Sequence, residues 1–583
     1  MSGAAKDADA YDGWRRQVEE AIDAAAAVLP GSTLLDDADP AGFAGALAKV
    51  GGRLALAPVR TATTLTRFGA RRFLATASAV LRAAGHDVAG PVADPPPDRR
   101  FADPAWEQNA WFYLLRQRHL LLEQLSDDLV DATRLQGGDR AKAAFVLRQL
   151  VDAAAPTNRL LGNPAALKRA FDSGGLSLAR GARTFVDDLV SHQGRPQQTV
   201  PGHYVVGRDL AATPGRVVFR NELMELIQYA AQTGQVHEVP LLLSPPWINK
   251  YYMMDLAPGR SLVEWAVQHG LTVFTISYRN PDESMRDVRL DDYLVSGPRQ
   301  AIDVVLDITG ADTVNMLGLC LGGTLTMATL AHLATTGDRR VRSATLLNTL
   351  VDFAEPGVLG VFTDEASVTR LERRMARTGF LSGSDMRATF DLLRSNDLVW
   401  GYVVNNWLLG EEPKPFDLLA WNEDSTRMPA DMHSFYLRSC YVGNELARGV
   451  MELDGVRLDL GAVTEDLYVV SAEQDHIAPW RSVYAGARLP SSDVRFVLSS
   501  SGHIAGVVNP PNPRSVHRVL DGGELPADPD LWHRRAEVRP GSWWEDWTPW
   551  ITERSGDLRT PPPLGNERHP ALGDAPGTYV LEH

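Results

Sequence analysis

The hydrophobic positions of this chain follow two different patterns. Up to about residue 200, Ala- and Leu-rich stretches such as WFYLLRQRHLLLEQL, residues 111–125, place apolar side chains three and four positions apart. This spacing is typical of helices with one buried face. A proline-rich break, ADPPPDRR at residues 93–100, separates a weakly patterned beginning from these helices. The pattern predicts a helical N-terminal domain over residues 1–200.

Beyond residue 200, the apolar residues gather in short unbroken runs separated by helix-length or loop-length segments. This pattern predicts an α/β domain over residues 201–583, with parallel strands covered on both faces. The predicted strands are residues 239–244, 272–278, 314–319, 343–350, 466–472 and 494–500. The interval from Asp352 to about Val463 is far longer than an ordinary connection. We therefore interpret residues 352–463 as a cap inserted over the end of the sheet.

Composition narrows the classes of function. The formal net charge of −15 over 583 residues argues against a general nucleic-acid binder, which needs a basic surface. No apolar run reaches about 18 residues, so no membrane span is expected. The beginning of the chain lacks the features of a secretory leader, so we expect a cytoplasmic protein. Two cysteines, Cys320 and Cys440, are too few for a disulfide scaffold or a thiolate zinc site. No metal or cofactor is expected.

One cysteine lies in a pattern that suggests chemistry. In VNMLGLCLGG, residues 314–323, an apolar strand runs into a turn and a helix, and Cys320 lies between Gly318 and Gly322. This is the nucleophile elbow of α/β-hydrolases, in which the nucleophile stands at a helix N-terminus that favours a thiolate. By itself the motif fits a buried structural cysteine equally well. Cys440 lies outside such a pattern and is predicted to be a small buried residue.

Partners for this nucleophile follow in the order that the fold requires. Asp475 comes after the strand at 466–472, and His503 comes after the strand at 494–500. In α/β-hydrolases the chain order is nucleophile, acid, histidine, each at a strand end. The order therefore predicts a Cys320–His503–Asp475 triad. Asp352 is an alternative acid, and His476 an alternative histidine.

A site for acyl transfer also needs donors for a developing oxyanion. One donor in the hydrolase pattern is the backbone N–H after the nucleophile, here Leu321. The other comes from the loop after an earlier strand, here SPPWINKYY. Pro245 and Pro246 have no N–H. We therefore expect the second donor at Trp247 or Ile248.

Several further blocks are recognisable together. PPWINKYYMMDL, FTISYRNPD, GLCLGG, WNEDSTRMPADMHSFYLRSCY, DHIAPW and SGHIAGVVNPP resemble the sequence blocks of poly(3-hydroxyalkanoate) synthases. The resemblance extends from about residue 100 to the C-terminus, and the chain is similar in size to the single-polypeptide class that acts on short-chain monomers. Two positions depart from the family pattern, which commonly has tryptophan at Tyr278 and asparagine at Arg427. Both lie outside the predicted triad and bear on substrate preference.

The resemblance implies a specific reaction. The enzyme would polymerise (R)-3-hydroxyacyl-CoA, with 3-hydroxybutyryl-CoA as the expected monomer, into polyhydroxyalkanoate with release of CoA. Cys320 would hold the growing chain as a thioester, with His503 as general base and Asp475 as its acidic partner. The implied partners are the CoA substrate, the growing polyester, the surface of cytoplasmic polyester granules and a second copy of the chain in a homodimer.

Alternatives remain at this stage. An intracellular polyester depolymerase or thioesterase with a cysteine nucleophile would share the fold, and a non-catalytic scaffold on granules would share the helical N-terminus. Trp421 fits either core packing or the lining of an acyl pocket. Trp543, Trp544, Trp547 and Trp550 recur at helical spacing and are predicted to pack a C-terminal helix onto the domain.

Overall fold

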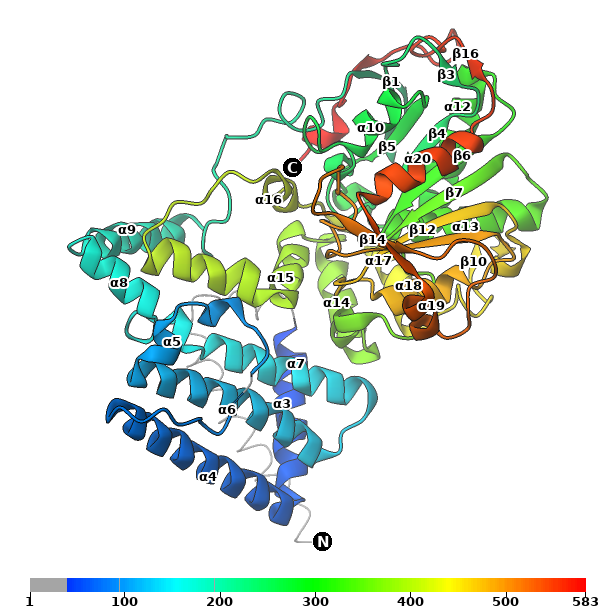
Figure 1. The fold of residues 1–583 in the computed structure, drawn as a ribbon. Helices are drawn as coiled ribbons and strands as arrows, with labels where there is room; N and C mark the ends of the chain where they lie inside the picture. Colours follow the sequence, from blue (N-terminus) through cyan, green and yellow to red (C-terminus); the bar gives the residue numbers. More distant parts are fainter. Residues whose placement is uncertain (1–38, 94, 193) are drawn as a thin grey trace. The chain divides into compact units, whose positions relative to one another are not determined.

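The computed structural model describes residues 39–93, 95–192 and 194–583. These residues form two compact units (Figure 1). One unit, here the helical unit, contains the described residues up to Val200 together with Arg387–Lys414. The other, the sheet unit, contains Pro201–Met386 and Pro415–His583. In neither unit is a described helix long and apolar enough to cross a membrane.

The helical unit is built from amphipathic helices that pack on one another. Its helices are α3 (Pro40–Ala55), α4 (Pro58–Ala83), α5 (Ala105–Gln108), α6 (Ala110–Thr133), α7 (Gly137–Ala153), α8 (Pro164–Asp172) and α9 (Leu176–Ser191). The side chain of Asn109 accepts the backbone N–H groups of Trp111 and Phe112 and so caps α6. Arg100 joins separate segments, since its guanidinium pairs with Asp98, Glu123 and Asp152.

The interval predicted as a single cap is divided between the two units. Residues 387–414 pack with the helical unit, where Trp407 donates its indole N–H to Asp188 of α9 at 2.8 Å. Trp400, Val403 and Trp407 form a small core there with Ala153. This differs from the expectation because the aromatic residues of the segment find their apolar partners more than 200 positions earlier in the chain. Such a pairing leaves no trace in local periodicity.

The sheet unit is organised around an 11-stranded sheet of order β15-β14-β13-β12-β7-β6-β4-β5-β2-β1-β17. Its strands are β1 (Gly215–Arg220), β2 (Met224–Tyr229), β4 (Leu241–Ser244), β5 (Val273–Tyr278), β6 (Val314–Leu319), β7 (Val341–Leu347), β12 (Asp466–Ala472), β13 (Val494–Ser499), β14 (Val516–Val519), β15 (Glu537–Pro540) and β17 (Gly573–Asp574). The six strands from β13 to β5 run parallel. They correspond to the six predicted apolar runs, which confirms the predicted α/β architecture.

Helices cover both faces of the sheet. One face packs against α10 (Leu262–Gln268) and α20 (Trp543–Glu553), with Trp543, Trp544 and Trp547 fully buried. The indole of Trp547 also donates to Thr345 Oγ1 of β7 at 2.9 Å. The predicted packing role of these tryptophans is therefore confirmed.

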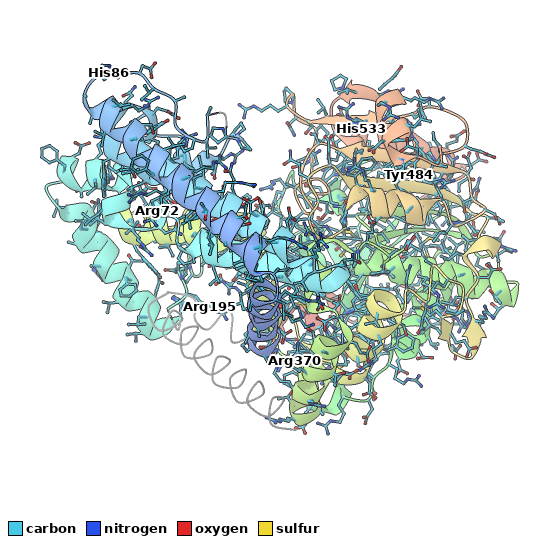
Figure 2. All side chains as sticks on the ribbon, turned by 90° about the horizontal axis from the view of Figure 1, so that it is seen from below. Arg72, His86, Arg195, Arg370, Tyr484 and His533 are labelled. Atoms are coloured by element: carbon cyan, nitrogen blue, oxygen red, sulfur yellow. The ribbon has the colours of Figure 1, made fainter. Side chains whose placement is uncertain are left out.

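The opposite face of the sheet carries the remaining helices. It contacts α12 (Gln300–Thr309), α13 (Leu321–Thr336) and α18 (Trp480–Ala487). Tyr484 of α18, labelled in Figure 2, stacks edge-on against Phe496 of β13 and also contacts Trp532 of α19 (Pro529–Arg535). Since both faces are buried, the loops at the carboxyl ends of the parallel strands are the natural place for a site.

The rest of the predicted cap belongs to the sheet unit. Its elements there are α14 (Glu365–Thr378), β8 (Phe380–Leu381), the start of α15 (Gly383–Leu393), α16 (Asp417–Glu423), β9 (Met428–Pro429), α17 (Ala430–Tyr436) and the π-helical turn η10 (Leu437–Val442). These segments contribute aromatic side chains near Cys320, as described below.

Candidate active site

Cys320 stands on a strained turn between β6 and α13. Its backbone has φ 51° and ψ −117°, which side-chain-bearing residues rarely adopt. A Cβ at Gly322 would collide with the carbonyl oxygen of Ser244, and a Cβ at Gly323 would collide with Thr349 Oγ1. Only glycine therefore fits at positions 322 and 323, where α13 begins. Cys320 N donates to Leu347 O of β7 at 2.8 Å, which ties the turn to the sheet.

His503 and Asp475 form a buried pair. Nδ1 of His503 lies 2.6 Å from Oδ2 of Asp475, and both side chains are almost fully buried. Oδ1 of Asp475 accepts the backbone N–H groups of Ile477 and Ala478 at 2.8 and 2.9 Å. Three hydrogen bonds therefore fix the orientation of the carboxylate. The ring nitrogen left for Cys320 is Nε2.

The charges of this pair favour a protonated histidine. Burial opposes protonation of the ring, but the negative charge of the Asp475 carboxylate, followed by the charge interaction with the sulfur of Cys320, outweighs it and raises the pKa of His503 to about 10. Cys320, His503 and Asp475 are thus brought together in the arrangement of a nucleophile, a base and an orienting acid.

Asn348 is a positioning residue that sequence reasoning missed. It follows β7, adopts a left-handed φ of 45° and donates its side-chain N–H to the main-chain oxygen of His503. Its own backbone N–H donates to Val470 O at 2.8 Å. The side chain therefore links the end of β7 to the loop that carries the histidine. An asparagine after an apolar strand, at a position that favours left-handed backbone, is the signal that could have found it.

The loop after β4 lies directly against the elbow. A Cβ at Gly322 would also come within 2.5 Å of the carbonyl oxygen of Pro245, so this loop and the start of α13 are in contact. Leu321 opens α13, and the first N–H groups of a helix have no acceptor within the helix. Thr426 Oγ1 braces the loop by donating to Trp247 O at 2.9 Å and accepting from Asn249 N at 2.8 Å. The segments expected to supply the oxyanion donors are therefore adjacent.

Aromatic residues of the cap lie near the thiol. The rings of Phe353, Tyr436 and Tyr441 contact one another with centroid separations of 5.0 to 6.2 Å. Burial, with smaller contributions that include Cys320, raises the pKa of Tyr436 and Tyr441 above the ordinary phenol value. Both phenols therefore stay neutral beside Cys320. Cys320 itself is partly exposed, so these rings shield one side of it.

The alternative residues have other partners. Oδ1 of Asp352 accepts from Ala354 N at 2.9 Å and from Asn444 Nδ2 at 2.8 Å. The structure pairs His503 with Asp475. Trp421 is 6% exposed and donates its indole N–H to Lys250 O at 2.8 Å, within the core cluster against which Cys320 packs. This position is compatible with either role considered for Trp421.

A cluster in the helical unit is the only group among the described residues whose ligand atoms approach as a metal site would. His119, Glu123 and Asp152 offer atoms within 4.8 Å of one another. Arg100 pairs with both carboxylates, and Arg148 pairs with Glu123. Because guanidinium groups already neutralise these carboxylates, the cluster is better explained as a structural ion-pair network.

Comparison with known proteins identifies the family. Residues 97–266 match the family model described as poly-beta-hydroxybutyrate polymerase (PhaC) N-terminus, and residues 257–510 match that of the alpha/beta hydrolase fold. A poly(3-hydroxyalkanoate) polymerase of Methylorubrum extorquens is 44% identical over 559 residues, 95% of this chain and 92% of that protein. The chain belongs to the poly(3-hydroxyalkanoate) polymerases. The poly(3-hydroxyalkanoate) polymerase subunit PhaC of Cupriavidus necator is 44% identical over 498 residues, 83% of each chain. That of Rhizobium meliloti is 43% identical over 502 residues, 86% of this chain and 82% of that protein. The family predicted from the sequence blocks is thereby confirmed.

Proposed function

We propose that this polymerase joins (R)-3-hydroxyacyl units from CoA thioesters into polyester, with 3-hydroxybutyryl-CoA as its monomer, and that the growing chain is held on Cys320. The observation that carries the proposal is the 2.6 Å contact between His503 and Asp475 beside a cysteine on a strained elbow. Membership of the polymerase family makes polymer, rather than free acid, the expected product.

The first half-reaction transfers an acyl group to sulfur. His503 holds the proton of Cys320, as its pKa of about 10 favours, and the thiolate attacks the thioester carbonyl. Backbone N–H groups at Leu321 and at Trp247 or Ile248 stabilise the oxyanion of the tetrahedral intermediate. The bond from the carbonyl carbon to the CoA sulfur then breaks, and His503 returns a proton to the leaving thiolate. Asp475 keeps the imidazole in one orientation throughout.

The second half-reaction extends the chain. His503, supported by Asp475, deprotonates the 3-hydroxyl group of the next unit, and the resulting alkoxide attacks the acyl carbon on Cys320. The carbon–sulfur bond breaks, an oxygen ester forms, and the sulfur of Cys320 leaves as a thiolate beside the protonated His503. The lengthened CoA thioester then acylates Cys320 again by the first half-reaction, which returns the growing chain to sulfur and releases CoA. A thiol suits this cycle because exchange between CoA and cysteine thioesters is nearly isoenergetic, so the acyl group stays activated. The rings of Phe353 and Tyr436, which are buried, and of Tyr441, which is partly buried, would keep water from competing with the hydroxyl group.

We further propose that the helical unit contacts the polyester granule. The outer face of α4 exposes Val59, Phe73 and Val80, each more than 60% accessible. The helix contains arginines, including Arg72 (Figure 2), and has no carboxylate. An exposed apolar stripe with a basic rim suits a hydrophobic particle coated with anionic groups. The proposals of a cytoplasmic location and of a homodimer rest on the family resemblance alone.

A single experiment tests the reaction. Purified enzyme is given 3-hydroxybutyryl-CoA, and both CoA release and the acyl product are measured. We expect polymer from the wild type and from Cys440→Ala, since Cys440 is buried and lies outside the elbow sequence. Cys320→Ala should release no CoA while remaining folded by circular dichroism. Free 3-hydroxybutyrate as the main product would instead support the thioesterase or depolymerase alternative, and no turnover by folded wild type would support the scaffold.

A further inference from the structure

Lys250 is a buried cation at the end of the proposed oxyanion loop. Its side chain is 4% exposed, and its ammonium group lies 2.9 Å from Asp424 Oδ1. The same group donates to the main-chain oxygens of Val580 and Glu582 at 2.6 and 2.7 Å. An ammonium group has three donors, and all three are used. Two of the three acceptors come from the last residues of the chain.

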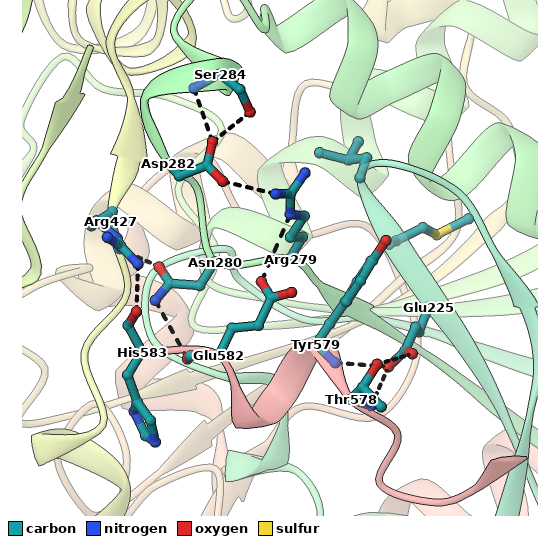
Figure 3. Close-up of polar contacts among 12 residues, drawn as sticks. Glu225, Arg279, Asn280, Asp282, Ser284, Arg427, Thr578, Tyr579, Glu582 and His583 are labelled. Carbon is teal, nitrogen blue, oxygen red and sulfur yellow. Dashed lines mark hydrogen bonds and ion pairs between the residues drawn. The ribbon is translucent and has the colours of Figure 1, made fainter. Parts of the chain in front are cut away.

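Those last residues, Thr578–His583, are here named the C-terminal strap. Glu225 of β2 is fully buried and accepts the backbone N–H groups of Thr578 and Tyr579 at 2.9 and 3.0 Å, as Figure 3 shows. The side chain of Val580 is 1% exposed and packs in the main core cluster. The strap is therefore anchored independently of Lys250, and its carbonyl groups are held at a defined place.

A segment of the cap completes the arrangement. Asn280 accepts the backbone N–H of Arg427 at 2.9 Å and donates to the main-chain oxygen of Glu582 at 3.4 Å. Arg427, one of the two departures from the family pattern, donates its guanidinium N–H to the main-chain oxygen of His583 at 2.6 Å (Figure 3). Trp421 in turn donates to Lys250 O. The loop that ends at Lys250 is thus held between the cap and the strap.

We propose that Lys250 is a positioning residue and that the C-terminal strap fixes the oxyanion loop through it. The inference rests on the proposed function, since it takes the Trp247–Ile248 segment as a source of oxyanion donors. Removing the strap would leave a buried ammonium group with Asp424 as its one remaining partner. Because burying an incompletely satisfied charge is unfavourable, Lys250 would move towards water and the loop with it. A displacement of about 1 Å at such a site can lower the rate about 10²-fold.

The test compares two reactions of the same thiol in three variants. The variants are deletion of residues 578–583, Lys250→Met, and Leu581→Ala as a control, since the Leu581 side chain is 51% exposed. Acylation by 3-hydroxybutyryl-CoA forms an oxyanion, whereas alkylation of Cys320 by iodoacetamide does not. We expect kcat to fall about 10²-fold in the deletion and in Lys250→Met, with KM within about threefold of wild type. Alkylation should stay within about twofold in both, and Leu581→Ala should resemble wild type in both reactions.

Two further measurements sharpen the result. Adding the deletion to Lys250→Met should lower kcat little further, because each change already removes the contact between Lys250 and the strap. The peptide TYVLEH, added to the deletion variant, should restore activity, but it should not restore activity to Lys250→Met. A kcat within about threefold of wild type in either single variant, or a parallel loss of alkylation, would overturn the proposal. Failure of the proposed function has a different signature, because the wild type itself would then release no CoA.

Discussion

Replacing Asp475 with asparagine tests whether Asp475 is the acid of the proposed triad, because it exchanges the oxygen that faces His503 for an NH₂ group. Oδ1 of Asp475 accepts the backbone N–H groups of Ile477 and Ala478, so the amide oxygen of the asparagine must take this position. The amide NH₂ group then takes the place of Oδ2 and faces Nδ1 of His503. Because two donors cannot bond to each other, His503 must carry its proton on Nε2. That tautomer cannot take a proton from Cys320.

The expected magnitude follows from the charge of the histidine. Against the opposing effect of burial, Asp475 and Cys320 raise the pKa of His503 from 6.5 to about 10. This corresponds to on the order of 5 kcal/mol in favour of the protonated ring, of which Asp475 supplies the leading part. We therefore expect Asp475→Asn to lower the rate of acylation by about 10³- to 10⁴-fold, with little change in KM.

The assay is single-turnover release of CoA from 3-hydroxybutyryl-CoA with enzyme in excess. Asp352→Asn is the matched control, because Asp352 bonds to Ala354 N and Asn444 and not to His503. Its rate should stay within about threefold of wild type. A loss of less than about tenfold in Asp475→Asn, or a larger loss in Asp352→Asn, would refute the assignment of the acid.

Three further predictions concern the elbow at Cys320 and the His503–Asp475 pair. Gly323→Ala should lower the free energy of unfolding by about 1–3 kcal/mol in urea titrations, because the new methyl group meets Thr349 Oγ1. Adding Thr349→Ala should recover part of the lost stability. The pKa of His503 is higher in the folded chain than in the unfolded chain, so protonation of the ring stabilises the fold. This stabilisation is fully present below pH 6.5 and is lost as the pH rises through about 10. The difference in unfolding free energy between wild type and His503→Gln should therefore shrink over that window; a constant difference would contradict the charge assigned to the ring. Cys320→Ser should fold and carry at most one acyl unit by mass spectrometry, because an oxygen ester is a poor acyl donor; polymer at the wild-type rate would contradict this reason for the thiol.

The central half of the sheet could be predicted from the sequence, and its edges could not. Strands buried on both faces appear as unbroken apolar runs, and β6 and β12 have the predicted bounds. β2 is also fully buried, yet it contains Glu225 and Gln228. Glu225 pairs with Arg220 nearby and with the C-terminal strap. Gln228 bonds to main-chain atoms of Pro563 and Gly565, which, like the strap, lie more than 300 positions later. Local periodicity cannot show that such polar groups are satisfied inside the fold.

The site shows the same division. The positions of Cys320, Asp475 and His503 at strand ends could be predicted, because each follows a recognisable strand in the order that the fold requires. Asn348 and Lys250 were missed, since each acts through a main-chain oxygen that only the folded chain brings near. The residues that can be read from sequence are those of the proposed chemistry, whereas those that hold the loops in place depend on tertiary contacts.

The most direct test of the account is to locate the growing chain. The enzyme is incubated briefly with 3-hydroxybutyryl-CoA, quenched in acid and digested, and the peptides that contain Cys320 and Cys440 are examined by mass spectrometry. The account predicts a ladder of masses on the Cys320 peptide, spaced by one hydroxybutyryl unit, and an unmodified Cys440 peptide. Chains attached to Cys440, or polymer made with no adduct on Cys320, would contradict it.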